Sequence, residues 1–322
     1  MKTSRVTKAD LAASVFAVPP LARHGELGLN PEANAAVIRH IEAGGVTSLV
    51  YGGNANFYGI GMYEYPALLD MLEQAAGPQT WVLPSAGPDF GKLMDQAAVL
   101  RARRFPAVMV LPMMFPSAPD GVAKGLRLFA QASATPLILY VKAEHLISLE
   151  DIGRLVDDGL VCGIKYAITR DAPLDDEFLT RLLDRVDRSL VVSGMAEIPA
   201  VDHLRALGMP AYTSGGVCIA PRLATRLLRS AQAGDFAEAE RCREHFLPLE
   251  RLRQRADAFA VLHEALTLSG IAEMGPQLPM LGELALAERQ ALIPIVAALM
   301  AAEAATPAAT SATAPAAVSA AA

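Results

Sequence analysis

The feature that most constrains this chain is an alternation of short apolar segments and amphipathic stretches through its first two-thirds. Eight segments of five or six residues are predominantly apolar, which is typical of buried strands. Between them, apolar residues recur every three or four positions, and this spacing predicts helices. The predicted strands are residues 14–18, 46–51, 80–85, 107–111, 137–141, 161–166, 190–194 and 210–215.

Turn and capping residues separate the two kinds of segment. Pro31 and Ser148 stand where helices are expected to begin, and Gly44, Gly77 and Gly159 stand where helices are expected to end. Eight strand–helix units of this size predict a closed parallel barrel, the (β/α)8 or TIM barrel of the α/β class. A doubly wound open sheet is the alternative, but no G-x-G-x-x-G follows the first predicted strand.

Three regions follow from this pattern. We predict a (β/α)8 barrel over residues 1–218 and C-terminal helices packed on the barrel over 219–304. The remaining residues, 305–322, are almost entirely Ala, Pro, Ser and Thr. They contain no large apolar side chain that could anchor them, so we expect a disordered tail.

Composition narrows the classes of function. The 322 residues are 52% hydrophobic and carry a net charge of -6, which allows a large core and gives no basic surface for nucleic acid. The three cysteines lie far apart, which indicates neither a disulfide framework nor a zinc site and fits a cytoplasmic protein. The six histidines form no H-x-H or E-x-x-H cluster, so we expect no metal and disfavour a metal-dependent barrel aldolase.

Two apolar stretches resemble membrane or export signals only superficially. The basic and apolar start of the chain is interrupted by Asp10, and Pro19 and Pro20 follow too early for a cleavage region. The apolar stretch 291–305 is too short and too rich in alanine to span a bilayer. We therefore expect neither a secretory signal nor a membrane anchor.

A single lysine, Lys165, stands in the apolar segment 161–166. Strand alternation places it on the same face as Gly163, and an inward orientation would bring it to the upper rim of the barrel, where active sites lie. Burial lowers the pKa of an amine, and a neutral amine can attack a ketone to form a Schiff base. The alternative is a lysine whose ammonium group extends to water.

A tyrosine near the end of the neighbouring predicted strand accompanies this lysine. Tyr140 lies on the same side of segment 137–141 as Ile138, and pairing in register would bring its phenol close to the Lys165 amine. A phenol there can transfer protons while an imine forms. A tyrosine that serves only for packing is the alternative.

The segments "LILYV" and "GIKYA" resemble the Y…GIK pattern of the dihydrodipicolinate synthase/N-acetylneuraminate lyase family, and the resemblance extends over residues 10–300. The resemblance implies a class I lysine-dependent lyase or aldolase on a (β/α)8 barrel that acts on pyruvate or other 2-oxo acids. It implies that Lys165 forms the imine and that Tyr140 transfers protons. It also implies that the protein needs no cofactor and forms a homotetramer or homodimer.

The chain departs from the family pattern after the second predicted strand. Where the family has a Gly-Thr-Thr-Gly-Glu turn, this chain has Gly52, Gly53, Asn54, Ala55 and Asn56, without a hydroxyl or a carboxylate. Backbone N–H groups of the two glycines can still bind a carboxylate, and the asparagine amides can donate hydrogen bonds. A simple Gly-Asn turn without a ligand is the alternative.

Two further departures affect the predicted site. Met113 and Met114 replace the paired tyrosines of the family, and methionine cannot relay protons. His145 stands where the family usually has a carboxylate-binding arginine. We include Lys142, His145 and Thr213 among the candidate substrate-binding residues, although the first two can equally be solvated loop residues.

These departures argue against a true dihydrodipicolinate synthase, because that reaction requires recognition of a second, aldehyde substrate. What remains is imine formation with a 2-oxo acid, followed by aldol cleavage or by dehydration of a 2-oxo sugar acid. We therefore predict a Schiff-base lyase with a small-molecule 2-oxo acid substrate and no nucleic-acid partner. A ligand-binding or degenerate member of the same barrel family, without catalysis, is the alternative.

Overall fold

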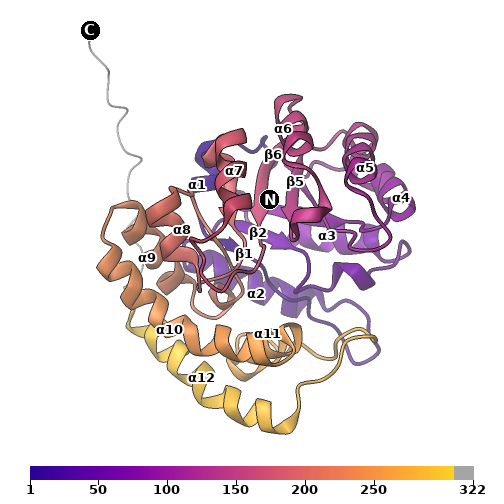
Figure 1. Cartoon of the computed structure of the whole chain (residues 1–322). Coiled ribbons are helices and arrows are strands. Elements are labelled where there is room, and N and C mark those ends of the chain that lie inside the picture. Colours follow the sequence, from indigo (N-terminus) through magenta and orange to yellow (C-terminus); the bar gives the residue numbers. More distant parts are fainter. Residues whose placement is uncertain (308–322) are drawn as a thin grey trace.

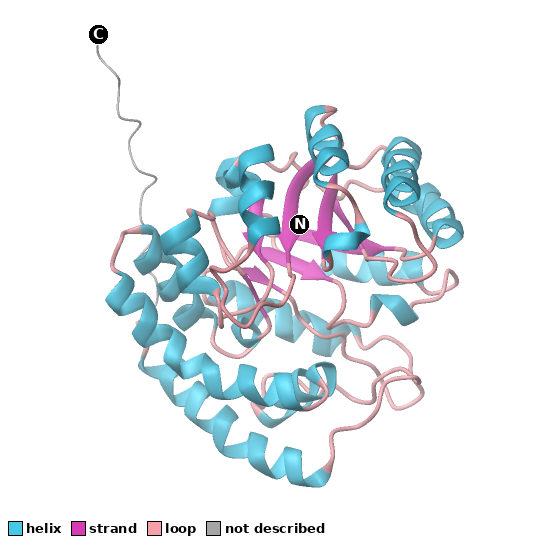
Figure 2. Cartoon of the chain, in the orientation of Figure 1, coloured by secondary structure: helices cyan, strands magenta, loops and turns pink. Residues whose placement is uncertain are grey.

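The computed structural model describes residues 1–307 and contains one eight-stranded parallel sheet surrounded by helices (Figure 1 and Figure 2). Each predicted strand is present, with shorter bounds at several ends because strands in a staggered barrel pair over only part of their length. The strands are Phe16–Ala17 (β1), Ser48–Tyr51 (β2), Trp81–Ala86 (β3), Val108–Val110 (β4), Leu137–Val141 (β5), Val161–Tyr166 (β6), Val191–Ser193 (β7) and Thr213–Ser214 (β8).

The strands follow one another around the barrel in the order β7-β6-β5-β4-β3-β2-β1-β8. A parallel bridge between Ser193 and Tyr212 joins β7 to the residue that precedes β8, which nearly closes the ring. The prediction of a (β/α)8 TIM barrel is confirmed, and the open doubly wound sheet is wrong.

Helices follow the strands and cover the outside of the barrel. Two of the predicted helix starts are capped by polar side chains: the side chain of Asn30, before Pro31, accepts from the N–H of Ala33, and that of Ser148 accepts from the N–H of Asp151. The helices are Lys8–Ala12 (α1), Pro31–Ala43 (α2), Tyr65–Ala75 (α3), Phe90–Arg101 (α4), Pro119–Ser133 (α5), Leu149–Asp157 (α6), Glu177–Arg185 (α7), Ala200–Leu207 (α8), Pro221–Gln232 (α9), Phe236–Arg255 (α10), Ala258–Leu268 (α11) and Leu286–Ala305 (α12), with 3-10 turns at Phe57–Gly59 (η1), Glu144–Leu146 (η2), Arg188–Leu190 (η3) and Gly216–Cys218 (η4).

The barrel interior is packed with side chains and is not a channel. Leu11 of α1 is fully buried and lies near Ile138 and Gly163 in the interior. A Cβ atom at Gly163 would lie 2.9 Å from Cδ1 of Ile138 and 3.3 Å from Cδ2 of Leu11. Gly163 therefore gives room to these two side chains beneath Lys165.

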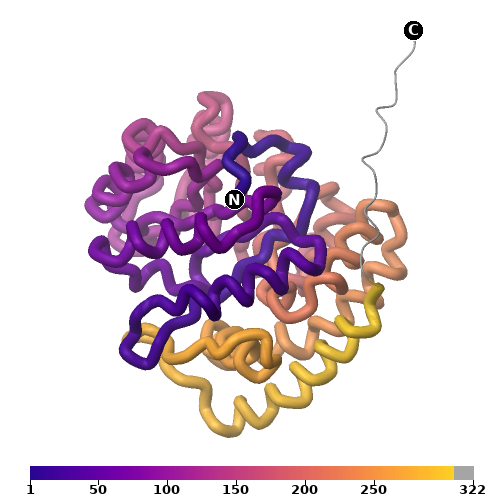
Figure 3. Tube along the Cα trace, turned by 180° about the vertical axis from the view of Figure 1, so that it is seen from behind, coloured from indigo at the N-terminus to yellow at the C-terminus, as the bar shows by residue number. Residues whose placement is uncertain are grey.

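The C-terminal helices form a layer along one side of the barrel, as both views of the chain show (Figure 1 and Figure 3). The buried carboxylate of Glu303 in α12 accepts hydrogen bonds from the N–H groups of Arg222 and Leu223 at the start of α9. This contact ties the last helix to the barrel. Of the predicted tail, residues 308–322 lie outside the described part of the chain. No helix in residues 1–307 is long and apolar enough to cross a membrane.

Candidate active site

Lys165 and Tyr140 lie side by side at the carboxyl ends of β6 and β5. The two residues are register partners in the parallel ladder, and the Nζ atom of Lys165 lies 4.1 Å from the centre of the Tyr140 ring. Both side chains line the same cavity. The strands therefore position an amine and a phenol together at the end of a parallel barrel where active sites are built.

Gly194, which follows β7, leaves the space that the lysine side chain occupies. A Cβ atom at this position would lie 2.9 Å from Cγ of Lys165 and 2.5 Å from the carbonyl oxygen of Tyr166. The N–H of Gly194 donates to that same oxygen at 2.6 Å. A larger residue here would displace the lysine or separate the two strands.

Burial controls the protonation of both groups. Loss of hydration lowers the pKa of Lys165 to about 8, and the positive charge of Arg253 adds to this effect. Burial raises the pKa of Tyr140, against a smaller opposing effect of Lys142. Near neutral pH, an appreciable fraction of the amine is therefore uncharged while the phenol retains its proton.

The cavity that contains these groups has a volume of about 310 Å³ and lies between the barrel and the α10–α11 junction. Three cationic residues line it, Lys142, Lys165 and Arg253, against one carboxylate among the described lining residues, Glu250. A chain with an overall charge of -6 thus has a cavity suited to an anion. The other lining residues are Val18, Asn54, Tyr140, Ala167, Thr169, Gly194, Met195, Ala196, Ile198, Thr213, Gly215, Gln254, Ala258 and Phe259.

The turn after β2 faces the cavity through one of its two asparagines. Asn54 lines the cavity, and its amide group is engaged: Nδ2 donates to the carbonyl of Val18 at 2.8 Å, and Oδ1 accepts from Arg253 at 3.3 Å. No other described residue accepts a hydrogen bond from the backbone N–H of Gly53 or Asn54. These two N–H groups are therefore free for a ligand.

The remaining residues of this turn have other positions. Gly52 is buried, and a Cβ atom there would lie 2.5 Å from Cε of Met109. Asn56 has a left-handed backbone conformation, with φ of 49°, and lines a separate small cavity with Arg23 and His263. The structure therefore brings Asn54, but not Asn56, to the lysine cavity.

Of the other candidate residues, two line the lysine cavity and one does not. Thr213 of β8 is buried and lines the lysine cavity, and the exposed Lys142 lines its rim. His145 is exposed in η2 and is not among the residues that line this cavity. The chain thus places a threonine and a lysine near Lys165, while the histidine points elsewhere.

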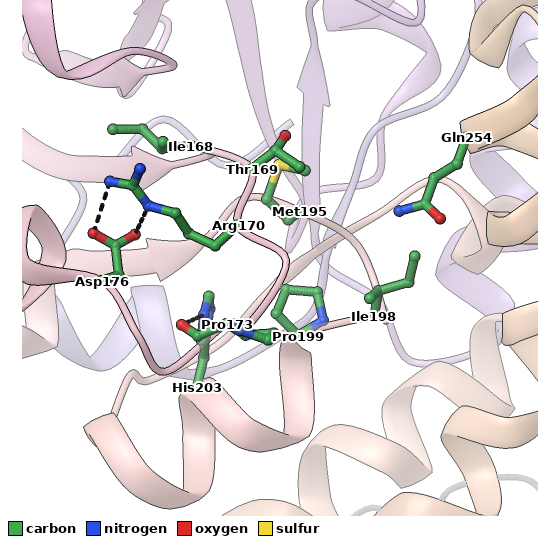
Figure 4. A pocket seen from close by; sticks show the side chains of 10 residues that line it. All are labelled: Ile168, Thr169, Arg170, Pro173, Asp176, Met195, Ile198, Pro199, His203 and Gln254. Carbon is green, nitrogen blue, oxygen red and sulfur yellow. Dashed lines mark hydrogen bonds and ion pairs between the residues drawn. The ribbon is translucent and has the colours of Figure 1, made fainter.

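A smaller pocket, lined in part by the loop after β6, adjoins the cavity (Figure 4). Thr169, Met195, Ile198 and Gln254 line both spaces. At its far side, Arg170 is held by Asp176 and Glu144 in a network of ion pairs. Its charge is therefore neutralised by two carboxylates and is less suited to bind a substrate.

A second hollow of about 410 Å³ lies beside the loop after β4 and is mainly apolar. Met113 lines it, as does Tyr140, whereas Met114 is largely exposed. This hollow does not contain Lys165. Of the two methionines at the family's tyrosine positions, Met113 therefore lies in an apolar region and Met114 lies at the surface.

Comparison with known proteins identifies the family. The dihydrodipicolinate synthetase family matches residues 12–299, which is nearly the whole described chain. The chain belongs to this family. Its members are lyases or aldolases, act on small molecules and are typically oligomeric.

Individual relatives within the family are distant. A probable 5-dehydro-4-deoxyglucarate dehydratase 2 from Streptomyces coelicolor is 27% identical over 258 residues, 78% of each chain. The structure of sialic acid aldolase from Ruminococcus gnavus matches with a TM-score of 0.80 at 14% identity, over 92% of this chain and 100% of that one. A prophage protein of the family from E. coli K12, solved in complex with pyruvate, gives a TM-score of 0.78 at 19% identity, over 89% and 98%.

This family member carries a group of charged residues behind the cavity that the sequence pattern does not indicate. Arg253 and Glu250 come from α10, and their side chains form a nearly buried ion pair with Nη1 to Oε1 at 2.8 Å. Glu197, in the loop after β7, is fully buried and bonded to the hydroxyl of Ser214. The spacing of Glu250 and Arg253 is an ordinary i,i+3 helix pair, so only the tertiary structure reveals their position.

The buried carboxyl group of Glu197 makes stability depend on pH. Burial, together with the nearby Glu250 carboxylate, raises the pKa of Glu197 above its usual range. The folded state therefore binds more protons than the unfolded state above the unfolded pKa, and stability falls as pH rises toward the folded pKa.

Replacing Glu197 with glutamine should remove the loss of stability that accompanies rising pH. Between pH 6 and 8.5, the free energy of unfolding of the wild type should fall relative to Glu197→Gln by about 1 kcal/mol or more. Chemical denaturation at both pH values measures the difference, with the exposed Glu283→Gln as control. Parallel pH dependence in wild type and Glu197→Gln would contradict a protonated Glu197.

Among residues 1–307, no group of three or more His, Cys, Asp or Glu is placed to hold a metal ion.

Proposed function

We propose that this protein is a Schiff-base lyase that acts on a 2-oxo sugar acid. The observation that supports this most strongly is the amine of Lys165 over the ring of Tyr140, in a cavity lined by further cations. Membership of a lyase and aldolase family supports the same reaction class.

The proposed reaction begins when the neutral Lys165 amine adds to the keto carbon. The carbinolamine then loses its hydroxyl as water to give an imine, which withdraws electrons from the neighbouring carbon. Transfer of a C3 proton to solvent gives an enamine, which expels the C4 hydroxyl group as water. We assign to Tyr140 the supply of the proton that this leaving group needs. Hydrolysis of the resulting unsaturated imine releases the product and frees the Lys165 amine. Aldol cleavage uses the same imine but breaks the C3–C4 bond instead.

We favour dehydration over aldol cleavage. The curated relatives carry the name of a dehydratase, and their named substrate, 5-dehydro-4-deoxyglucarate, is a sugar diacid with a keto carbon next to one carboxylate. A cavity with Lys142 and Arg253 in addition to the reactive lysine suits a substrate with two carboxylates. The likeness to sialic acid aldolase supports only the fold.

A panel of 2-oxo sugar acids tests the reaction type. We expect a 3-deoxy-2-oxo diacid to lose water. Mass spectrometry and NMR of the product detect this loss. Release of pyruvate from the panel would favour aldol cleavage. A protein that turns over no member and forms no adduct with pyruvate and borohydride would contradict the proposal.

The rate of adduct formation should rise with pH. Only the neutral amine adds to a ketone, and the pKa of Lys165 is lowered to about 8. The neutral fraction, and with it the initial rate of trapping by pyruvate and cyanoborohydride, should therefore increase roughly 50-fold between pH 6 and 8 and then level off. If the midpoint of the pH–rate curve lay near the ordinary pKa of a lysine side chain, the amine would not be desolvated.

A further inference from the structure

Arg253 comes from a helix outside the barrel and nevertheless lines the lysine cavity. Its side chain is 11% exposed and is fixed on three sides. Nη1 donates to both oxygens of Glu250, at 2.8 and 3.0 Å, and Nε donates to the carbonyl of Ala258 at 3.2 Å. Nη2 donates to Oδ1 of Asn54 at 3.3 Å.

These contacts leave donors of Arg253 and of the neighbouring turn without an acceptor among the described residues. A guanidinium has five N–H groups, two of them on Nη2. Within residues 1–307, the second N–H of Nη2 has no acceptor, and neither do the backbone N–H groups of Gly53 and Asn54. Asn54 connects the Arg253 donors with the backbone donors of the turn, because its side chain contacts Arg253 and its backbone belongs to the turn.

A fixed guanidinium beside two free backbone donors is an arrangement that binds a carboxylate. We propose that Arg253, together with the N–H groups of Gly53 and Asn54, binds the carboxylate next to the keto group of the substrate. This inference rests on the proposed function and adds to it a specificity-determining residue from the C-terminal helices. His145, which lies outside the cavity, is not needed for this role.

Glu250 sets the strength of this contact. Its carboxylate neutralises part of the guanidinium charge and holds the group in place. Removal of the charge while the side-chain size is kept, as in Glu250→Gln, should therefore strengthen the binding of an anion. Removal of the guanidinium should weaken it. The two variants are expected to act in opposite directions.

The experiment compares pyruvate with methyl pyruvate, which has the same ketone but no carboxylate. The concentration that gives half-maximal borohydride trapping at Lys165 is measured for the wild type, Arg253→Met and Arg251→Met. Arg251 is exposed on the same helix and does not line the cavity, so its variant removes an equal charge as a control. We expect Arg253→Met to raise the value for pyruvate about 10- to 100-fold, as for loss of a charged hydrogen bond. The value for methyl pyruvate should change much less in Arg253→Met, because it reflects only the effect of the Arg253 charge on the Lys165 amine. Both values should remain unchanged in Arg251→Met.

Other outcomes have distinct meanings. Equal losses for pyruvate and methyl pyruvate in Arg253→Met would show that Arg253 acts only on the structure or on the Lys165 amine, and no loss would show that it binds no carboxylate. Either result overturns the inference while leaving the Schiff-base proposal intact. If the wild type itself is not trapped by pyruvate, the proposed function fails.

Thermal stabilisation by pyruvate provides a second measurement that does not require an imine. We expect pyruvate to raise the melting temperature of Lys165→Met, in which no imine can form, and methyl pyruvate to leave it unchanged. In the Lys165→Met background, the shift should be absent when Arg253→Met is added and partial when Arg253→Lys is added, because lysine keeps the charge but lacks the paired N–H donors of a guanidinium. If Arg253→Met does not fold, Arg253→Lys takes its place in both measurements. An unchanged shift in the arginine variants would overturn the inference.

Discussion

Replacing Lys165 with methionine should abolish adduct formation with pyruvate and borohydride, and should reduce turnover by roughly 10⁴-fold or more, the scale of losing a covalent nucleophile. Methionine fills a similar volume and removes the amine, so the barrel should remain folded. Stability should even increase slightly, since burial of the ammonium group disfavours the charged form of this lysine.

The measurement combines peptide mapping by mass spectrometry with turnover on the active member of the substrate panel. Lys124→Met serves as the control, because Lys124 is an exposed lysine of α5 that should react with no substrate. Full activity in Lys165→Met would exclude the imine mechanism. If a chelator then removed that activity, a metal-dependent reaction would replace it.

Replacing Tyr140 with phenylalanine should separate imine formation from the later proton transfers. The ring is retained beside the lysine, so a trapped adduct should still form, but more slowly. Turnover should fall about 10²- to 10⁴-fold, the usual contribution of a positioned acid or base. Burial raises the pKa of Tyr140, so the phenol remains a proton donor through neutral pH.

Steady-state turnover and single-turnover trapping measure the two steps separately. Tyr63→Phe is the matched control, because Tyr63 is 90% exposed. Equal loss of trapping and turnover in Tyr140→Phe would assign the phenol to imine formation alone. Unchanged turnover would leave Tyr140 with a packing role.

The barrel could be predicted from the sequence because each strand and helix is signalled by its own residues. The pairing of Tyr140 with Lys165 could also be predicted, because adjacent parallel strands place equivalent positions side by side. Strand alternation placed Gly163 and Lys165 on one face but did not decide that this face points into the barrel.

The polar part of the site could not be predicted in this way. Arg253 and Glu250 follow an ordinary surface-helix pattern, and only the path of α10 over the barrel mouth brings them to the cavity. Asn54 and Asn56 are two residues apart, yet the left-handed conformation of Asn56 turns it into another cavity. Such effects depend on tertiary contacts and on single backbone angles, which local patterns do not encode.

The junction of α10 and α11 has a consequence for how such an enzyme can diversify. The lysine and the phenol are anchored in the sheet, whereas Arg253 and Phe259 reach the substrate space from helices that follow the last strand. Exchange of a few turns of these helices between relatives can therefore change the residues that line the cavity, while the strands that carry Lys165 and Tyr140 keep their positions.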